Sequence, residues 1–362
     1  MSPSGPNPFG VYLHIPFCSK RCDYCAFATW TDRHHLHAEY VAGCITQLQR
    51  EQSQPATSVF VGGGTPSLIE PRLLASLLAA VATAPGAEVT VECNPDNVTV
   101  ELLRVYADAG VNRISLGVQS TVAHVPASLG REHDRAAVRR AGDAVNEVGF
   151  RSFNLDVIYG AAGESVADWE QTLRDVVDLA PFHVSAYGLT VEAGTPLAGP
   201  PPRHPDDDDQ ATKYSLAEAM LSAAGLANYE ISNWAAPGHE CAHNVLYWRQ
   251  GDYLGVGCAA HSHRDGRRWW NHRTPERYLA AVADGQSPES GAEELDAATR
   301  RFEAVELLLR TRDGVPTSAL DLDDPDLAGL AVRVGDRVVL TVAGRLLANE
   351  VALRLRYDAP TQ

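Results

Sequence analysis

The chain has 362 residues, of which 45% are hydrophobic, and its 30 basic and 46 acidic side chains give a net charge of −16. This acidity argues against a broad nucleic-acid-binding face, which would be basic. No apolar run approaches the ~18 residues of a membrane-spanning helix, and the start lacks the basic and apolar parts of a signal peptide. We therefore expect a cytoplasmic protein with reduced cysteines and no membrane segment.

Strand-like and helix-like segments alternate after residues 1–9, which are rich in proline and glycine and expected to be disordered. Strands are predicted at 11–17, 58–62, 88–93, 113–119, 153–159 and 183–189. Helices are predicted at 33–51, 71–83, 99–109, 134–148, 166–179 and 206–224. Six such units in series predict an α/β fold, with a parallel sheet covered by helices. The periodicity permits either a partial barrel or an open doubly wound sheet.

The first predicted strand leads into a loop with three cysteines, Cys18, Cys22 and Cys25, in the spacing C-x3-C-x2-C. A tight loop can turn three thiols toward one point, as a metal cluster requires. Structural zinc sites usually have four ligands, and no fourth cysteine follows nearby. Three thiolates suit a [4Fe–4S] cluster with one iron left open. The alternatives are a disulfide with a spare thiol, a thioredoxin-like pair, and a zinc site completed by His14.

The segment Tyr12–Cys25, YLHIPFCSKRCDYC, resembles the radical S-adenosylmethionine (SAM) enzymes. It is most similar to the branch that contains oxygen-independent coproporphyrinogen III oxidase and the HemW-type heme chaperones. The resemblance implies a partial, six-stranded (β/α)6 TIM-like barrel over residues 10–225. It also implies that the three cysteines hold a [4Fe–4S] cluster and that SAM binds the open iron. In that superfamily one electron from the cluster cleaves SAM to a radical, so an electron donor is an expected partner.

Polar and glycine-rich residues follow one predicted strand after another, and barrel active sites lie at such strand ends. The second strand ends in Gly62-Gly-Gly-Thr-Pro66, where glycine lets the backbone approach a ligand. This turn resembles the GGTP motif of radical SAM enzymes. A plain sharp turn, a solvated Glu92 and a buried structural Asp156 are the alternative interpretations. The resemblance implies a SAM pocket made of Tyr12, Tyr24, Gly63, Gly64, Thr65, Glu92, Gln119, Arg131 and Asp156.

Residues 226–296 are dense in aromatics, glycines and histidines and have little regular period. We expect loops that cover the barrel mouth, followed by a polar linker at 282–296. The segment His243-Asn244-Val-Leu-Tyr-Trp248 resembles the HNxxxW motif of the heme chaperones. The resemblance implies that His243, Asn244 and Trp248 help to hold heme, since histidine is a common axial ligand of heme iron. A hydrogen-bonded histidine and a core tryptophan are the alternative, and Cys241 is a rival ligand.

The tail, residues 297–362, resembles the small winged-helix-like α+β domain that ends this family. We predict helices at 297–311, 317–322 and 343–353 and a strand at 331–341. The acidity of the chain favours an intramolecular lid over a DNA-binding role.

The oxidase carries a fourth cysteine two places after the third, where this chain has Phe27, and it has a longer N-terminal arm. Both differences favour a heme chaperone that passes heme to client hemoproteins, membrane-associated ones among them. The alternatives are the oxidase itself, which decarboxylates propionate side chains, and a radical SAM enzyme with another substrate. The sequence leaves open whether SAM is cleaved.

Overall fold

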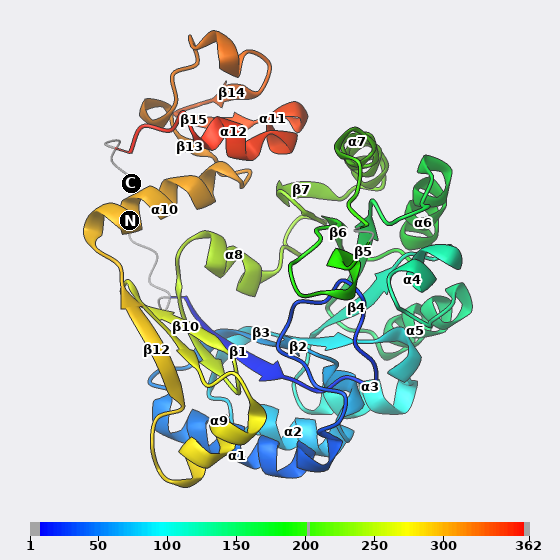
Figure 1. Ribbon diagram of the computed structural model, residues 1–362, viewed down its shortest axis with the longest axis vertical. Coiled ribbons are helices and arrows are strands. Elements are labelled where there is room, and N and C mark those ends of the chain that lie inside the picture. Colours follow the sequence, from blue (N-terminus) through cyan, green and yellow to red (C-terminus); the bar gives the residue numbers. More distant parts are fainter. Residues whose placement is uncertain (1–7, 201–202, 358–362) are drawn as a thin grey trace.

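A long curved sheet forms the centre of the computed structural model, which describes residues 8–200 and 203–357 (Figure 1). Its six central strands are parallel and follow one another in chain order. They are β1 (Phe9–Ile15), β2 (Ala56–Gly63), β3 (Thr83–Cys93), β4 (Arg113–Gln119), β5 (Ser152–Tyr159) and β6 (His183–Gly188). A doubly wound sheet would reverse its strand order at a switch point, so the predicted partial barrel is confirmed.

Helices cover the outer face of this sheet, as the alternating pattern predicted. The helix predicted at 71–83 ends at Ala79, because Thr83 already begins β3. Helix α5 shows how the ends are fixed: the side chain of Asp134 accepts a hydrogen bond from Ala137 N, and Gly149 closes the helix at φ +79°. The covering helices are α1 (His37–Glu51), α2 (Pro71–Ala79), α3 (Val100–Asp108), α4 (His124–Ser128), α5 (Arg135–Val148), α6 (Val166–Asp178) and α7 (Asp207–Ala223).

The strands have an apolar outer face and a polar inner face. In β4, Ile114, Leu116 and Val118 are fully buried in the core between sheet and helices. Arg113 and Ser115 alternate with them and line the inside of the barrel. Successive residues of a strand point to opposite faces, so each central strand contributes both to the core and to the barrel interior.

Residues 226–296 do not form the loop layer and linker that we expected. They contain six strands and two helices that extend the sheet at both ends: β7 (Ala227–Glu230), β8 (Asn233–Ala235), α8 (Ala242–Trp248), β9 (Asp252–Val256), β10 (His261–Arg264), β11 (Arg267–Asn271), α9 (Pro275–Ala283) and β12 (Glu289–Glu294). Strands β8 and β7 continue from β6, and β9 to β12 continue from β1. The polar segment forms an edge strand because Glu294 and Glu293 pair with Arg267 and Arg268 of β11.

The last part of the chain forms an α+β unit with its own apolar core. It consists of α10 (Ala297–Leu309), β13 (Val315–Pro316), β14 (Ala331–Val334), β15 (Arg337–Leu340), α11 (Val342–Leu346) and α12 (Ala348–Ala352). The predicted strand 331–341 is a hairpin that turns at Gly335, and the predicted helix 343–353 is two short helices. The helix predicted at 317–322 is only a 3-10 turn, Thr317–Ala319. The winged-helix-like topology stays a prediction.

The C-terminal unit does not cover the end of the barrel that carries the cysteines. It contacts α8 and α7 instead, where Arg345 pairs with Glu218 at 2.9 Å and Arg312 pairs with Glu240. The expected lid is therefore wrong for the cysteine end of the barrel.

The expected N-terminal disorder lies mostly outside the described residues, since the description begins at residue 8. Phe9, which we had placed in that segment, is fully buried and starts β1. Among the residues that the structure describes, none of the helices combines the length and apolar character needed to cross a bilayer.

Candidate functional site

The cysteine loop is fastened to the glycine-rich turn after β2. Gly64 N donates to Ile15 O at 2.7 Å, and Thr65 N donates to Phe17 O at 2.8 Å. A Cβ on Gly64 would lie 2.7 Å from Phe17 O, so only glycine allows this close approach. The two loops therefore form one rigid rim at the C-terminal ends of β1 and β2. We call this end of the barrel the mouth.

All seven cysteines are free, and three of them lie on this rim. Burial raises the pKa of Cys18 and Cys25, and Thr65 Oγ1 donates to Cys18 Sγ at 3.6 Å. Within residues 8–200 and 203–357, no three histidine, cysteine or acidic side chains converge on a single metal ion. Thiols spread around one cavity suit a cluster of several iron atoms better than one zinc ion.

His14 does not complete a zinc site with these cysteines. Its Nε2 hydrogen-bonds to Ala28 O at 2.9 Å, and its Nδ1 to the hydroxyl of Tyr12 at 3.1 Å. Burial lowers its pKa to about 4, so the ring is neutral and both nitrogens are occupied. His14 is therefore not available as the fourth ligand of a zinc site in this structure.

A cavity of about 530 Å³, the mouth cavity, opens at the rim. Its walls include the three cysteines and all but one of the residues predicted for the SAM pocket: Tyr24, Gly63, Gly64, Thr65, Glu92, Gln119, Arg131 and Asp156. Tyr12 is the exception, because β1 places its side chain in a second cavity farther down the barrel. Its predicted place beside the ligand stays a prediction.

Glu92 and Asp156 face each other inside the barrel but differ in their partners. Asp156 accepts hydrogen bonds from Ser115 Oγ at 2.7 Å and Asn154 Nδ2 at 2.9 Å. Among the described residues, the carboxyl group of Glu92 accepts only from Gly63 N, at 3.2 Å. Burial, and then the charge of Asp156, raises the pKa of Glu92 to about 8. Glu92 is thus a buried acid with free hydrogen-bonding capacity, not a solvated loop carboxylate.

Gln119 and Arg131 occupy the wall between these acids and the cysteine loop. Gln119 ends β4 at φ +59°, beside a register shift between Gly117 and Gln119. Left-handed backbone is costly for a residue other than glycine, and such strain concentrates at functional sites. Arg131 Nη2 donates to Tyr24 OH at 3.4 Å, while its buried Nε finds no partner among the described residues. Both side chains are therefore placed to contact a ligand in the mouth cavity.

A second cavity, of about 150 Å³, lies inside the barrel near the N-terminal strand ends. We call it the floor cavity. Its main polar walls are Arg113, Ser115, Asn154, Asp156, His183, Tyr187, Tyr229, His243 and Asn244. Three side chains, Glu92, Asp156 and Tyr187, line both cavities. The mouth and the floor are therefore adjacent compartments of one polar interior.

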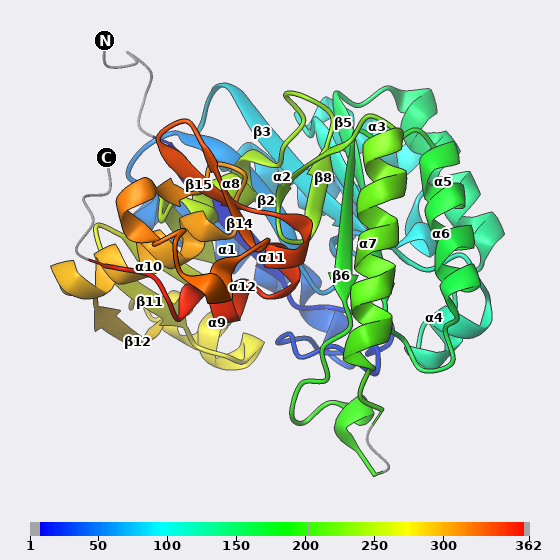
Figure 2. The ribbon, with the colours of Figure 1, turned by 90° about the horizontal axis from the view of Figure 1, so that it is seen from above.

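The HNxxxW segment forms α8 and closes the floor, not the mouth as we expected. His243 Nδ1 hydrogen-bonds to Ser58 Oγ at 3.0 Å, and its ring lies 2.9 Å from where a Cβ on Gly10 would be. Both partners stand near the starts of their strands. Figure 2 shows α8 and the blue loop that follows β1 toward opposite ends of the central strands. The error has a topological cause, since β7 and β8 reverse direction beside β6 before α8 begins.

His243 is 1% exposed and has a partner on each nitrogen, because Nε2 hydrogen-bonds to Tyr247 OH at 2.8 Å. Burial lowers its pKa to about 3, so the ring is neutral. Asn244 Nδ2 donates to Tyr229 OH and to Glu230 Oε1, both at 3.1 Å.

The other heme candidates have no open coordination position either. Trp248 is half-buried and does not line the floor cavity, and its indole nitrogen has no partner among the described residues. Burial raises the pKa of the Cys241 thiol to about 12. The structure brings these side chains together as a plug, without an exposed histidine nitrogen.

Sequence reasoning missed Arg113, His183 and Tyr229, which line the floor. Arg113 begins the predicted strand 113–119, and the sequence predicts no role for it. One signal could have found it. Strands buried on both faces are usually apolar throughout, whereas β4 and β5 alternate polar with apolar residues. That alternation indicates a polar barrel interior.

Comparisons with known proteins agree with this geometry. The radical SAM superfamily is matched over residues 12–176. The heme chaperone HemW of Mycobacterium tuberculosis is 41% identical over 98% of this chain and 96% of that protein. HemW of Escherichia coli is 35% identical over 95% of this chain and 97% of that protein.

A solved structure of coproporphyrinogen III oxidase (HemN) from Escherichia coli, described as a radical SAM enzyme, superposes with a TM-score of 0.82 at 21% identity. It covers 96% of this chain and 89% of that chain, and it shows the shared fold. The chain therefore belongs to the radical SAM superfamily and, within it, to the HemW family of heme chaperones.

Proposed function

We propose that this protein is a heme chaperone that carries a [4Fe–4S] cluster and SAM and passes heme to client hemoproteins. The identity of 41% over almost the whole of both chains, to a protein named as a heme chaperone, carries this proposal. Phe27 supports it, because this exposed side chain stands where the oxidase has its fourth cysteine. The clients can include membrane-associated proteins, and the cytoplasm is the expected compartment.

In this proposal Cys18, Cys22 and Cys25 hold the cluster, and Thr65 steadies the first thiolate. A bound cluster would supply one-electron reduction of SAM, with the electron coming from a donor protein. Backbone at Gly63 and Gly64 lets SAM approach closely. The charged and amide groups of the mouth cavity that would orient SAM are Glu92, Gln119, Arg131 and Asp156, with Tyr24 beside the adenine.

His243 is our proposed ligand for heme iron, with Asn244 and Trp248 beside it. Iron would take Nε2 in place of the hydroxyl of Tyr247. Because this nitrogen is buried against α8 itself, α8 has to move away from the starts of β1 and β2 before heme can bind there.

The test is an anaerobic heme titration of the reconstituted full-length protein, run beside an assay with coproporphyrinogen III. We expect heme binding without decarboxylation. His243→Ala should change the heme spectrum, whereas Tyr247→Phe, the matched control, frees Nε2 and should tighten binding. Catalytic formation of protoporphyrinogen would contradict the chaperone proposal, and identical spectra for wild type and His243→Ala would remove this ligand.

The cluster is tested separately, by iron and sulfide content of the reconstituted variants Cys18→Ala, Cys22→Ala and Cys25→Ala. We expect each to lose the cluster, while Cys44→Ala, a buried cysteine outside the loop, keeps it. A full cluster in all three loop variants would contradict the assignment.

A further inference from the structure

Arg113 is a buried cation without a partner. It is 2% exposed and lines the floor cavity. Within the described parts of the chain its side chain forms neither an ion pair nor a hydrogen bond, and its Nε is fully buried. A buried charge is costly unless it is paired and hydrogen-bonded.

Of the described acids near Arg113, two are engaged elsewhere, and the third, Glu92 on the same cavity wall, forms no ion pair with it. Asp156 is held by Ser115 and Asn154, and Glu88 Oε1 accepts from His243 N at 3.3 Å. Both carboxylates act on Arg113 through space, but neither forms an ion pair with it. None of the guanidinium donors is therefore taken up by a described residue, and the cavity lies beside them.

The other polar walls of the cavity satisfy one another in a chain. Asn154 Nδ2 donates to Asp156, so its Oδ1 accepts from His183 Nδ1 at 2.7 Å. Burial, and then the charge of Arg113, lowers the pKa of His183 well below its usual range, so its Nε2 accepts from Tyr229 OH at 2.9 Å. Tyr229 in turn accepts from Asn244. Arg113 is the one arginine or lysine among the lining residues.

We propose that the floor cavity binds a carboxylate group through Arg113. A guanidinium presents a planar fork that matches a carboxylate with two parallel hydrogen bonds. The cavity volume of about 150 Å³ compares with ~30 Å³ for one water molecule, which leaves room for a formate- or acetate-sized group. A porphyrin ring does not fit.

Two sources can supply this carboxylate. One is a free acid of one or two carbons. The other is a propionate arm of heme, and this source rests on the proposed function, because His243 lines the same cavity. Both sources present the same group to Arg113, so the experiment has an arm for each.

The first arm measures saturable binding of ¹³C-formate to the reconstituted full-length protein by NMR, beside the thermal unfolding midpoint at constant ionic strength. We expect formate to raise the wild-type midpoint by about 2–4 °C relative to chloride. Arg113→Met should lose both signals. Arg140→Met, the same change on the exposed face of α5, should keep them.

Arg113→Lys keeps the charge without the fork, and we expect it to bind formate about tenfold more weakly. It serves in place of Arg113→Met if that variant does not fold. No saturable formate binding by the wild type would overturn the proposal, and so would equal binding by Arg113→Met.

The second arm titrates heme and its dimethyl ester. If the carboxylate belongs to heme, formate competes with heme, and the ester binds wild type as weakly as heme binds Arg113→Met. If it belongs to a free acid, formate and Arg113→Met leave heme affinity unchanged. A protein that binds no heme would contradict the proposed function and would leave the formate result standing, so the two failures are distinguishable.

Discussion

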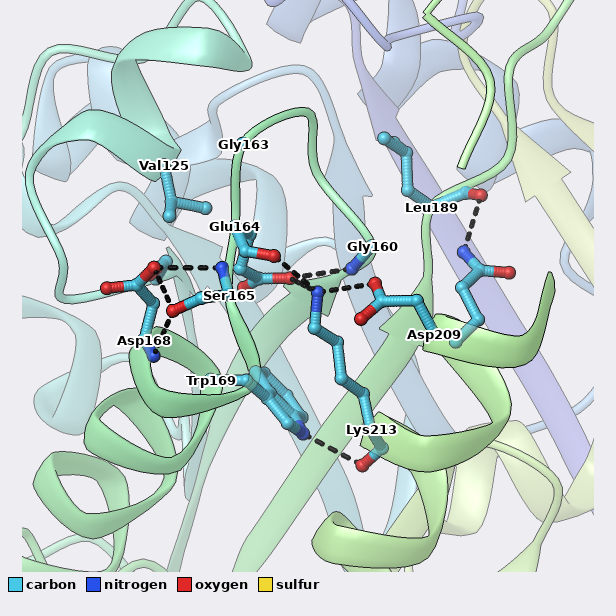
Figure 3. Close-up of polar contacts among 12 residues, drawn as sticks. Val125, Gly160, Gly163, Glu164, Ser165, Asp168, Trp169, Leu189, Asp209 and Lys213 are labelled. Atoms are coloured by element: carbon cyan, nitrogen blue, oxygen red, sulfur yellow. Dashed lines mark hydrogen bonds and ion pairs between the residues drawn. The ribbon is translucent and has the colours of Figure 1, made fainter. Parts of the chain in front are cut away.

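Two buried cations of this molecule, Lys213 and Arg113, differ in whether acidic side chains pair with them. Lys213 of α7 is 0% exposed, and its Nζ lies 3.1 Å from Glu164 Oε2 and 2.6 Å from Asp209 Oδ2. It also donates to the carbonyl of Glu164 at 2.8 Å (Figure 3). Arg113, at the start of β4, forms no ion pair with any acid in the described parts of the chain.

The surroundings of Lys213 explain what its charge is for. Glu164 Oε2 also accepts from Gly160 N at 2.7 Å, and Trp169 Nε1 donates to Lys213 O at 2.8 Å. These bonds tie the turn after β5 to α6 and α7, close to the mouth (Figure 3). Where a buried cation only holds elements together, this fold supplies its counter-charges. A buried cation that lacks them, facing a cavity, is therefore better explained by a ligand.

The largest effect is expected from Lys213→Met, which leaves Glu164 buried without its cation. Breaking such a pair costs about 3–5 kcal/mol of unfolding free energy. The measurement is anaerobic urea unfolding. Arg104→Met, which removes an exposed pair with Glu147, should cost under about 1 kcal/mol. Equal small losses in both variants would show that the Lys213 pair is not structural.

Glu92 is a buried acid that, like Arg113, lacks an ion-pair partner among the described residues. Its raised pKa makes the stability of the protein depend on pH. Its pKa of about 8 in the folded state exceeds the usual 4.5, so the folded protein retains a proton that the unfolded chain releases between these values. Stability therefore falls as pH rises through this window, by up to about 1.4 kcal/mol per unit, and levels off above it.

The check is the unfolding free energy of the SAM-free protein from pH 6 to 9. Glu92→Gln should lack the slope that wild type shows. An unchanged slope in the variant would mean that Glu92 is ionised throughout.

SAM binding separates the mouth from the floor. Glu92→Ala should weaken SAM binding by roughly ten- to a hundred-fold, since a charge-assisted contact is worth about 1.5–3 kcal/mol. Asp156→Ala should do the same. His243→Ala, at the floor, should leave SAM affinity within about twofold of wild type. Equilibrium binding of SAM to the reconstituted proteins measures all three, and unchanged affinity in both acid variants would contradict the pocket.

The smallest effect completes the comparison. In buffer without carboxylates, Arg113→Met should stay within about 1 kcal/mol of wild type or be more stable, because it removes a buried charge that forms no ion pair or hydrogen bond with a described residue. The unfolding free energy in chloride buffer is the measurement. A loss as large as that of Lys213→Met would show that Arg113 has a structural partner after all.

The sequence predicts the central strands to within a few residues, because each one combines a run of buried side chains with a glycine-rich or polar end. The mouth follows from those ends, since parallel strands bring them to one edge. The outer strands escaped prediction because β7 and β8 have only four and three residues and because β12 is a polar segment that pairs with the arginines of β11. The position of His243 depends on the path by which the chain returns to the start of β1, and no local pattern encodes that path.

The hydrogen-bonded chain beneath the mouth has a thermodynamic consequence. Asn244, Tyr229, His183, Asn154 and Asp156 follow one another without a gap, so a displacement of α8 removes the first donor of a series that ends on a wall of the mouth cavity. Linkage is reciprocal. If displacement of α8 lowers the affinity for SAM by some factor, bound SAM lowers the equilibrium constant for displacement of α8 by the same factor. Under the proposed function, in which SAM binds in the mouth and α8 opens for heme, occupancy of one end of the barrel therefore sets how readily the other end opens.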